Sequence, residues 1–258
     1  GSTIGLSLKT SLTLTYMGFI FWAIGSIAYA INPTEVVVNL SRQLNVFLMF
    51  FSMAIFLFTF KNKLSFIPWL ITLILGVELY AVFNEALEMI NTSGTINSGV
   101  LKGVTANRNI TAFSIAIKIP FVLFLIHLEK KNWIKFVLSI GITLALIALS
   151  MIQSRASFVA VGATTIAYLL MHTVLYLKVN KKWTQLFQSA FLLVPLLLAV
   201  LLNQTFLSSK GADVLSRAAT ISVSTNDGSV NQRLRYYEDV LTHMTSNPIL
   251  GLGLGNWK

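Results

Sequence analysis

The sequence contains long apolar stretches of about twenty residues with few or no charged side chains. They lie at roughly 8–30, 43–60, 67–90, 110–128, 134–152, 156–177 and 184–207. About 20 residues of helix cross a bilayer, and lipid accepts only helices or closed barrels, because backbone polar groups must be paired within the protein. Barrel strands would alternate polar and apolar residues, and these stretches do not. The sequence therefore predicts an all-α, polytopic membrane bundle of about seven spans.

Composition agrees with this prediction. Of the 258 residues, 55% are hydrophobic and 11% are charged, whereas a soluble domain carries about a quarter charged residues. We expect one membrane domain over 1–258, in which 208–258 form an outer loop and an amphipathic helix. Cysteine is absent and no metal-ligand spacing is visible, so we expect neither a metal nor a cofactor. The net charge of +10 is explained by topology, and nucleic acid is not an expected partner.

Lysines and arginines divide between the predicted loops. The loops after the second, fourth and sixth stretches are rich in lysine, which places them on the cytoplasmic side. These lysines are Lys61, Lys63, Lys130, Lys131, Lys135, Lys178, Lys181 and Lys182. The opposite loops, 31–42, 91–109, 153–155 and the tail from 208, then face outward.

All six arginines fall on the predicted outer side: Arg42, Arg108, Arg155, Arg217, Arg233 and Arg235. A planar guanidinium offers paired donors to phosphate or carboxylate, so the outer face is expected to bind an anionic group. The alternative is that these arginines reach lipid headgroups or pair with nearby acidic residues. Arg155 sits in the shortest link, between two spans, where a cation is held at the hydrocarbon boundary.

Two ionisable residues, Glu78 and Lys118, lie near the middle of adjacent spans, each about 15 Å from the inner end at 1.5 Å per residue. We predict that they form an ion pair. The functional alternative is a proton or ion relay, extended outward by Glu85, in a secondary transporter or anion carrier. An inverted repeat would favour that alternative, and none is visible. His127 and His172 lie at inner helix ends, where interfacial packing is expected.

The tail resumes a helical pattern after a polar stretch at 208–232, which we interpret as a mobile outer loop. Apolar residues over 230–245 recur at steps of three and four and predict an amphipathic helix. Arg233 lies beside its apolar stripe, whereas Arg235 points to water. Gly251, Gly253 and Gly255 follow; without a preceding strand they indicate a tight turn rather than a nucleotide loop.

Three segments of the outer side resemble the O-antigen ligase and O-antigen polymerase superfamily of bacterial envelope proteins. They are Gly103 with Asn107-Arg108-Asn109 at the start of a span, Ser154-Arg155-Ala156 between two spans, and Arg233-x-x-x-Tyr237 followed by Pro248 and the glycine stretch. The resemblance covers about residues 100–258. Tyr237 stands where many members have Trp. Members also continue to an outer histidine, so we expect this chain to be truncated and to lack the catalytic base.

The resemblance implies a membrane glycosyltransferase, either ligase or polymerase, in the bacterial inner (cytoplasmic) membrane, with its arginine-rich loops periplasmic or extracellular. It would transfer glycan from an undecaprenyl-pyrophosphate carrier to a glycan, lipid or protein acceptor, with membrane lipids around it. Arg155 and Arg233 would be catalytic by stabilising the departing pyrophosphate. Arg108, Asn107, Asn109 and Arg217 would bind substrate. A non-catalytic membrane scaffold is a further alternative.

Overall fold

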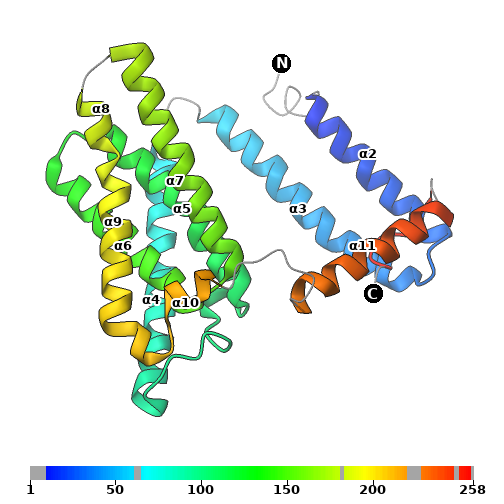
Figure 1. The fold of residues 1–258 in the computed structure, drawn as a ribbon. Helices are drawn as coiled ribbons and strands as arrows, with labels where there is room; N and C mark the ends of the chain where they lie inside the picture. Colours follow the sequence, from blue (N-terminus) through cyan, green and yellow to red (C-terminus); the bar gives the residue numbers. More distant parts are fainter. Residues whose placement is uncertain (1–9, 61–64, 181–182, 220–227, 247–249, 257–258) are drawn as a thin grey trace. The chain divides into compact units, whose positions relative to one another are not determined.

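The structure is a computed structural model that describes residues 10–60, 65–180, 183–219, 228–246 and 250–256. Over these ranges it contains helices and turns but no strand, and seven of the helical segments are long and apolar enough to cross a membrane (Figure 1). The prediction of an all-α polytopic membrane bundle is confirmed. The membrane-length helices are α2 (Ser11–Gly25, continued by η1, Ser26–Ala28), α3 (Pro33–Thr59), α4 (Phe66–Ser93), α5 (Arg108–Leu128), α6 (Asn132–Ile152), α7 (Arg155–Leu175) and α9 (Ala190–Leu202, continued by η5, Asn203–Leu207, and η6, Ser208–Lys210).

Shorter elements connect these helices or follow them. They are η3 (Gly103–Thr105), the π-helical turn η4 (Tyr176–Asn180), α8 (Trp183–Gln188), α10 (Val214–Ala219) and α11 (Gly228–Ser246). Helix α11 confirms the helix predicted over 230–245.

The second span begins ten residues earlier than predicted. Asn32 caps α3 by accepting a hydrogen bond from the Thr34 amide at 3.1 Å, and Pro33 occupies the first helical position. Both are favourable helix-start residues. The predicted outer loop 31–42 is therefore wrong over 33–42. The error arose because those residues are amphipathic, and a search for apolar runs does not detect an amphipathic helical segment.

The predicted mobile loop 208–232 is also partly wrong. Its first part forms η6 and the short helix α10, and its last residues belong to α11. Asp213 starts α10 by accepting hydrogen bonds from the Leu215 and Ser216 amides at 3.0 and 3.4 Å. Residues 220–227 of this predicted loop lie outside the described residues.

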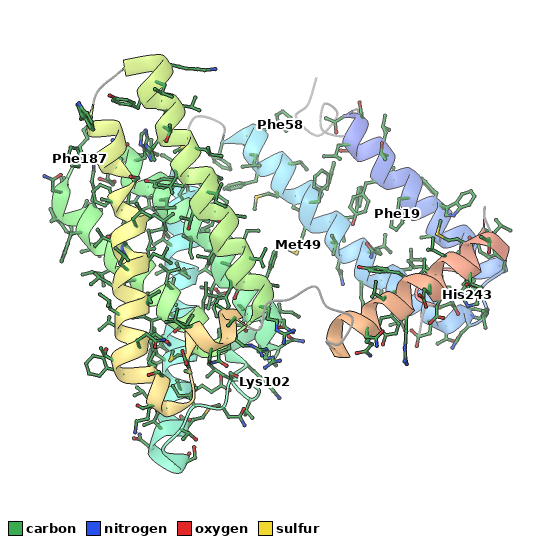
Figure 2. The ribbon with its side chains drawn as sticks, viewed as in Figure 1. Phe19, Met49, Phe58, Lys102, Phe187 and His243 are labelled. Carbon is green, nitrogen blue, oxygen red and sulfur yellow. The ribbon has the colours of Figure 1, made fainter. Side chains whose placement is uncertain are left out.

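The chain forms two compact units. The hairpin unit comprises 1–64 and 223–258 and contains α2, α3 and α11; the bundle unit comprises 65–222 and contains α4 to α10. In the hairpin unit, the Tyr16 ring of α2 packs edge-on against Phe47 of α3, with centroids 5.2 Å apart. The Phe19, Met49 and Phe58 side chains are exposed along these helices, as lipid-facing residues are (Figure 2).

Helix α5 is at the centre of the bundle unit, where it packs against α4, α6 and α7. One of its faces is buried at steps of three and four residues, through Ile115, Ile119, Val122 and Ile126. This spacing places all four side chains on one helical stripe. Helix α6 packs on α5 and also on α9. The core of the unit therefore lies around the α5–α6 pair.

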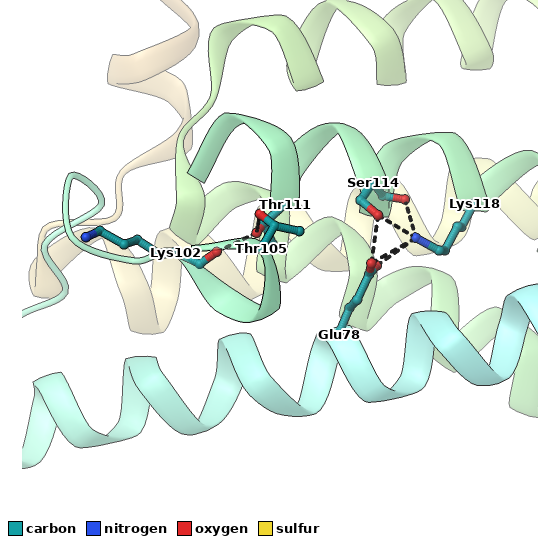
Figure 3. Close-up of polar contacts among 6 residues, drawn as sticks. All are labelled: Glu78, Lys102, Thr105, Thr111, Ser114 and Lys118. Atoms are coloured by element: carbon teal, nitrogen blue, oxygen red, sulfur yellow. Dashed lines mark hydrogen bonds and ion pairs between the residues drawn. The ribbon is translucent and has the colours of Figure 1, made fainter. Parts of the chain in front are cut away.

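The predicted ion pair between Glu78 and Lys118 is present within this core (Figure 3). Lys118 Nζ of α5 lies 2.9 Å from each carboxylate oxygen of Glu78 on α4. The Ser114 hydroxyl donates to Glu78 Oε1 at 2.7 Å, and the Lys118 ammonium also donates to the Ser114 carbonyl. Glu78 is 7% exposed. The pair joins α4 to α5 across an otherwise apolar contact.

Candidate functional site

The loop before α5 and the first residues of that helix contain the first of the three motif segments. Asn107 caps α5, and its side-chain oxygen accepts hydrogen bonds from the Asn109 and Ile110 amides at 3.0 and 3.4 Å. Arg108 is the first residue of the helix. Its guanidinium lies at 3.5 Å from the Ser98 carbonyl, a contact within the same loop. The Asn107 cap therefore fixes the backbone position from which the Arg108 and Asn109 side chains extend.

A carboxylate from α4 holds this loop. The Glu85 carboxylate accepts hydrogen bonds from the Lys102 amide at 3.0 and 3.2 Å and from the Gly103 amide at 2.7 Å. The Thr111 hydroxyl donates to the Lys102 carbonyl and contacts the Thr105 hydroxyl at 2.7 Å (Figure 3). The sequence-based hypothesis placed Glu85 on an ion path, whereas here its oxygens bind backbone amides.

Position 103 in this loop has no room for a side chain. Its φ is +58°, and an added Cβ would lie 2.9 Å from Thr111 Cγ2 and 3.0 Å from Val82 Cγ2. The backbone thus passes between α4 and α5 at a place where only glycine fits. The Glu85 contacts, Gly103 and Thr111 together fix the loop one turn before Asn107.

The second motif segment meets the first. Gln153 ends α6 with a φ of +54°, and Ser154 occupies the cap position of α7. The Ser154 hydroxyl donates to Asn109 Oδ1 at 3.2 Å. Arg155, the first residue of α7, is half-buried beside this contact. Two segments 45 residues apart in the chain are thereby joined at one end of the bundle unit.

Arg217 reaches the same turn from α10. Its Nε donates to the Gln153 carbonyl at 3.2 Å, while Gln153 Nε2 donates to the Gly211 and Asp213 carbonyls at 3.4 and 3.3 Å. Figure 1 shows α10 at the end of the bundle unit where α7 begins. We refer to Asn109, Ser154, Arg155 and Arg217 as the turn cluster.

Buried polar contacts support α10. Asn203 is completely buried, and its amide donates to the Ser150 hydroxyl at 3.0 Å and to the Ala212 carbonyl at 2.6 Å. The Gln204 side chain donates to Asp213 Oδ1 at 2.9 Å. That hydrogen bond, followed by those from the Ser216 and Leu215 amides, lowers the pKa of Asp213 below its ordinary value. The carboxylate form is therefore the one that caps α10.

An apolar groove lies beside the turn cluster. It has a volume of about 390 Å³ and is lined by residues of α6, α7 and α9 and by Val214, the first residue of α10. Ser150 and Phe158 line its end nearest Arg155, and Ile166 and Leu196 line it near the middle of the spans. We call this the outer groove. It offers an apolar path from mid-membrane to the turn cluster.

The third motif segment belongs to the hairpin unit. Gly253 has a φ of +88°, and an added Cβ would clash with Ala30, so the chain passes close to the turn between α2 and α3. The Leu254 amide donates to Ser26 Oγ at 3.2 Å, and Asn256 Oδ1 accepts from the Asn32 amide at 2.6 Å. These contacts agree with the interpretation of the glycine stretch as a tight turn.

Helix α11 carries Arg233 and Arg235. Arg235 is exposed, as its place on the helical wheel predicts. The side chain of Arg233 lies outside the description. The expectation that Arg233 acts on the same ligand as Arg155 therefore stays a prediction from the sequence.

Sequence reasoning missed two residues that position the turn cluster, Glu85 in the role it has here and Asn203. The sequence did contain a signal for Asn203. A polar residue inside an apolar span is costly unless it is hydrogen-bonded, which predicts a buried partner for its side chain. The contact of Glu85 with the loop amides could not be predicted from the sequence, because it depends on how α4 packs against η3.

Comparisons with known proteins agree with the resemblance. Residues 140–258 match the family model described as O-Antigen ligase. This range includes Arg155, Arg217 and Arg233, while Asn107 and Asn109 precede it. A search of curated proteins and a search of solved structures each found no match.

Proposed function

We propose that the chain is a membrane glycosyltransferase of the O-antigen ligase type, which uses an undecaprenyl-pyrophosphate-linked glycan as donor and acts on the outer side of the bacterial inner membrane. The match of residues 140–258 to the O-antigen ligase family model supports this proposal. The observation that carries the proposal is the turn cluster. Hydrogen bonds from Ser154 to Asn109 and from Arg217 to Gln153 bring two arginines and the asparagine motif to one turn at the end of the outer groove.

The chemistry requires stabilisation of a departing anion. The acceptor hydroxyl oxygen bonds to the anomeric carbon of the glycan, and the bond from that carbon to the pyrophosphate oxygen breaks. Negative charge grows on the pyrophosphate, and fixed guanidinium donors stabilise it most at the transition state. Arg155 and Arg217 supply such donors, with Arg233 added by the sequence-based prediction. The resemblance assigns the base that takes the hydroxyl proton to a histidine that follows the glycine stretch in other members.

The outer groove fits the carrier lipid. Its walls are apolar side chains of α6, α7 and α9, which suit the first isoprene units of a polyprenyl chain. Its volume is in the range of about 300–1,000 Å³ that is common for small-molecule sites. In this arrangement the pyrophosphate lies at the turn cluster while the chain stays in the hydrocarbon layer.

The contacts favour the enzyme over the transporter alternative. Glu78 and Lys118 bind one another and Ser114, and Glu85 binds the loop backbone. Each of these groups therefore has a structural partner, which an ion path would have to break.

Reconstitution tests the proposal. Proteoliposomes carrying the full-length protein are incubated with an undecaprenyl-pyrophosphate-linked oligosaccharide and with lipid A core, free glycan or a protein acceptor in turn. We expect glycan on one acceptor and equimolar release of undecaprenyl pyrophosphate. Ion flux that depends on Glu78, without binding of the lipid pyrophosphate, would instead support the transporter.

A further inference from the structure

A second groove lies in the other half of the bundle unit, toward the lysine-rich loops, and has no part in the proposed transfer. It has a volume of about 480 Å³ and runs between α5 and α7. We call it the inner groove. Its lining residues are Pro120, Leu123, Phe124, His127, Thr164, Ala167, Tyr168, Met171 and Leu175.

The length of the inner groove matches one leaflet of a bilayer. Along α5 it extends from Pro120 to His127, and along α7 from Thr164 to Leu175. At 1.5 Å per residue these distances are about 10 and 17 Å. Half of a hydrocarbon core of about 30 Å is about 15 Å. The groove therefore reaches from the lysine-rich end of the helices to about the middle of the membrane.

The inner groove is separate from the outer groove. On α7 the outer groove uses Val161, Gly162 and Ile166, whereas the inner groove uses other residues, among them Ala167 and Met171. The two grooves are also lined by different partners of α7, because α6 and α9 line the outer one and α5 lines the inner one. Both grooves can therefore hold a lipid at the same time.

Polar groups lie beside the inner groove, with His127 at the end of its path along α5. His127 Nδ1 lies 3.0 Å from Gln188 Oε1, and the Tyr168 hydroxyl donates to the Gln188 carbonyl at 3.3 Å. These contacts place the end of α8 beside the groove. The apolar path thus ends in a rim that can interact with a headgroup.

The rim carries positive charge. Lys130 and Lys131 follow His127 within four residues, and Lys178 follows Leu175 by three; all three side chains are exposed. Glu129 is the acidic residue in the same stretch. Lys135, further on, lies over the Phe191 ring at 5.9 Å. Three exposed lysines against one glutamate leave the rim able to attract an anionic headgroup.

We propose that the inner groove binds one anionic phospholipid of the lysine-rich leaflet, with an acyl chain between α5 and α7 and its phosphate at Lys130, Lys131 and His127. A zwitterionic lipid can place the same chain in the groove, but it gains less from the lysines. Basic pockets between membrane helices select anionic headgroups in this way. The depth of one leaflet selects a phospholipid chain rather than a longer isoprenoid.

Native mass spectrometry of the full-length protein tests the assignment. The delipidated protein in mild detergent is titrated with phosphatidylglycerol and, separately, with phosphatidylcholine of the same chains. We expect one retained phosphatidylglycerol per protein, with phosphatidylcholine retained more weakly. Replacing both Lys130 and Lys131 by Gln should weaken phosphatidylglycerol retention roughly thirtyfold, at about 1 kcal/mol for each lysine near a membrane surface. The charge-matched control replaces Lys102 and Lys210, at the other end of the helices, and should retain the lipid.

A second variant tests the groove itself without changing charge. Ala167 lines the inner groove and is exposed, so Ala167→Phe places a ring inside the groove. In the control, Ala163→Phe places the same ring at an exposed position of α7 that lines neither groove. Retention should be lost in Ala167→Phe and kept in Ala163→Phe. Equal retention of both lipids, equal loss in both phenylalanine variants, or displacement of phosphatidylglycerol by undecaprenyl phosphate would overturn the proposal. None of these outcomes depends on glycan transfer, so the proposed function stands or falls separately.

Discussion

Arg155 begins α7 beside the Ser154–Asn109 hydrogen bond, so its guanidinium starts from a fixed backbone position. Arg155→Lys keeps the charge but loses the paired donors. Transfer by the full-length protein should fall by about ten- to a thousandfold if a charge-assisted contact of roughly 1.5 to 4 kcal/mol is lost. The measurement is the initial rate of glycan transfer in proteoliposomes.

Helix α11 supplies the matched control for this series. From the sequence, Arg233→Lys should reduce transfer in the same way, whereas the exposed Arg235→Lys should be close to neutral. Equal losses at Arg233 and Arg235 would mean that α11 contributes general positive charge rather than a specific contact.

The Glu78–Lys118 pair makes a prediction about stability. Lys118→Met leaves the Glu78 carboxylate without its cation in the core, which should cost about 3 to 5 kcal/mol by the precedent of buried ion pairs. The double variant Glu78→Leu/Lys118→Met removes both charges and should be milder. Thermal unfolding in one detergent compares the three proteins, and equal losses in the single and double variants would contradict the pairing.

At the scale of elements, Glu85 on α4 determines how well the loop before α5 is held. Two carboxylate oxygens of Glu85 now accept from the Lys102 and Gly103 amides, and Glu85→Gln keeps one of these oxygens. The other oxygen is replaced by an NH2 group, a donor that faces the backbone N–H donors. Hydrogen exchange of these two amides should accelerate by about tenfold or more, since an unsatisfied partner costs about 1–3 kcal/mol.

Glu88→Gln is the control for this element, because the Glu88 carboxylate accepts from Asn84 on its own helix at 3.0 Å rather than from the loop. If Glu85 positions the asparagine motif, its variant should also raise the KM for donor more than it lowers kcat. Unchanged exchange at Lys102 and Gly103 would show that the loop is held by Thr111 and Gly103 alone.

Helix α10 should depend on pH through Asp213. The pKa of Asp213 is lowered from 3.8 in the folded protein, so its stabilising contribution is complete above about pH 4 and is lost as the pH falls through the lowered value. Asp213→Asn keeps an acceptor oxygen for Gln204 and the two amides but cannot titrate. The protection factors of the α10 amides, which are corrected for the intrinsic pH dependence of exchange, should change between about pH 3 and pH 5 in the natural chain and stay constant in the variant.

At the scale of the whole molecule, topology can be tested directly, because the chain contains no cysteine. Ser98 lies in the loop before α5, and Asn132 begins α6 after the lysine-rich link. Cysteines introduced at these two positions should react with a membrane-impermeant maleimide from opposite sides of the membrane. Labelling of both from one side would contradict the alternation on which the outer location of the arginines depends.

The sequence predicted those features that depend on neighbouring residues. Seven spans follow from local apolar runs, and Glu78 and Lys118 could be paired because their depths were equal. The start of α3 was missed because it depends on capping by Asn32 rather than on apolar content. The contacts of Ser154 with Asn109 and of Arg217 with Gln153 join residues 45 and 64 positions apart, so they follow only from packing.

The hydrogen bond between Ser154 and Asn109 also aligns two macrodipoles. Helices α5 and α7 both begin at this contact, so their positive ends point to the same place, each worth roughly half an elementary charge. The Ser154 hydroxyl is directed to Asn109, so its oxygen adds no side-chain cap to α7 and the positive end of that helix keeps its field. Part of the attraction for an anion therefore comes from the peptide backbone. It persists when arginine side chains are replaced, and no change of pH removes it.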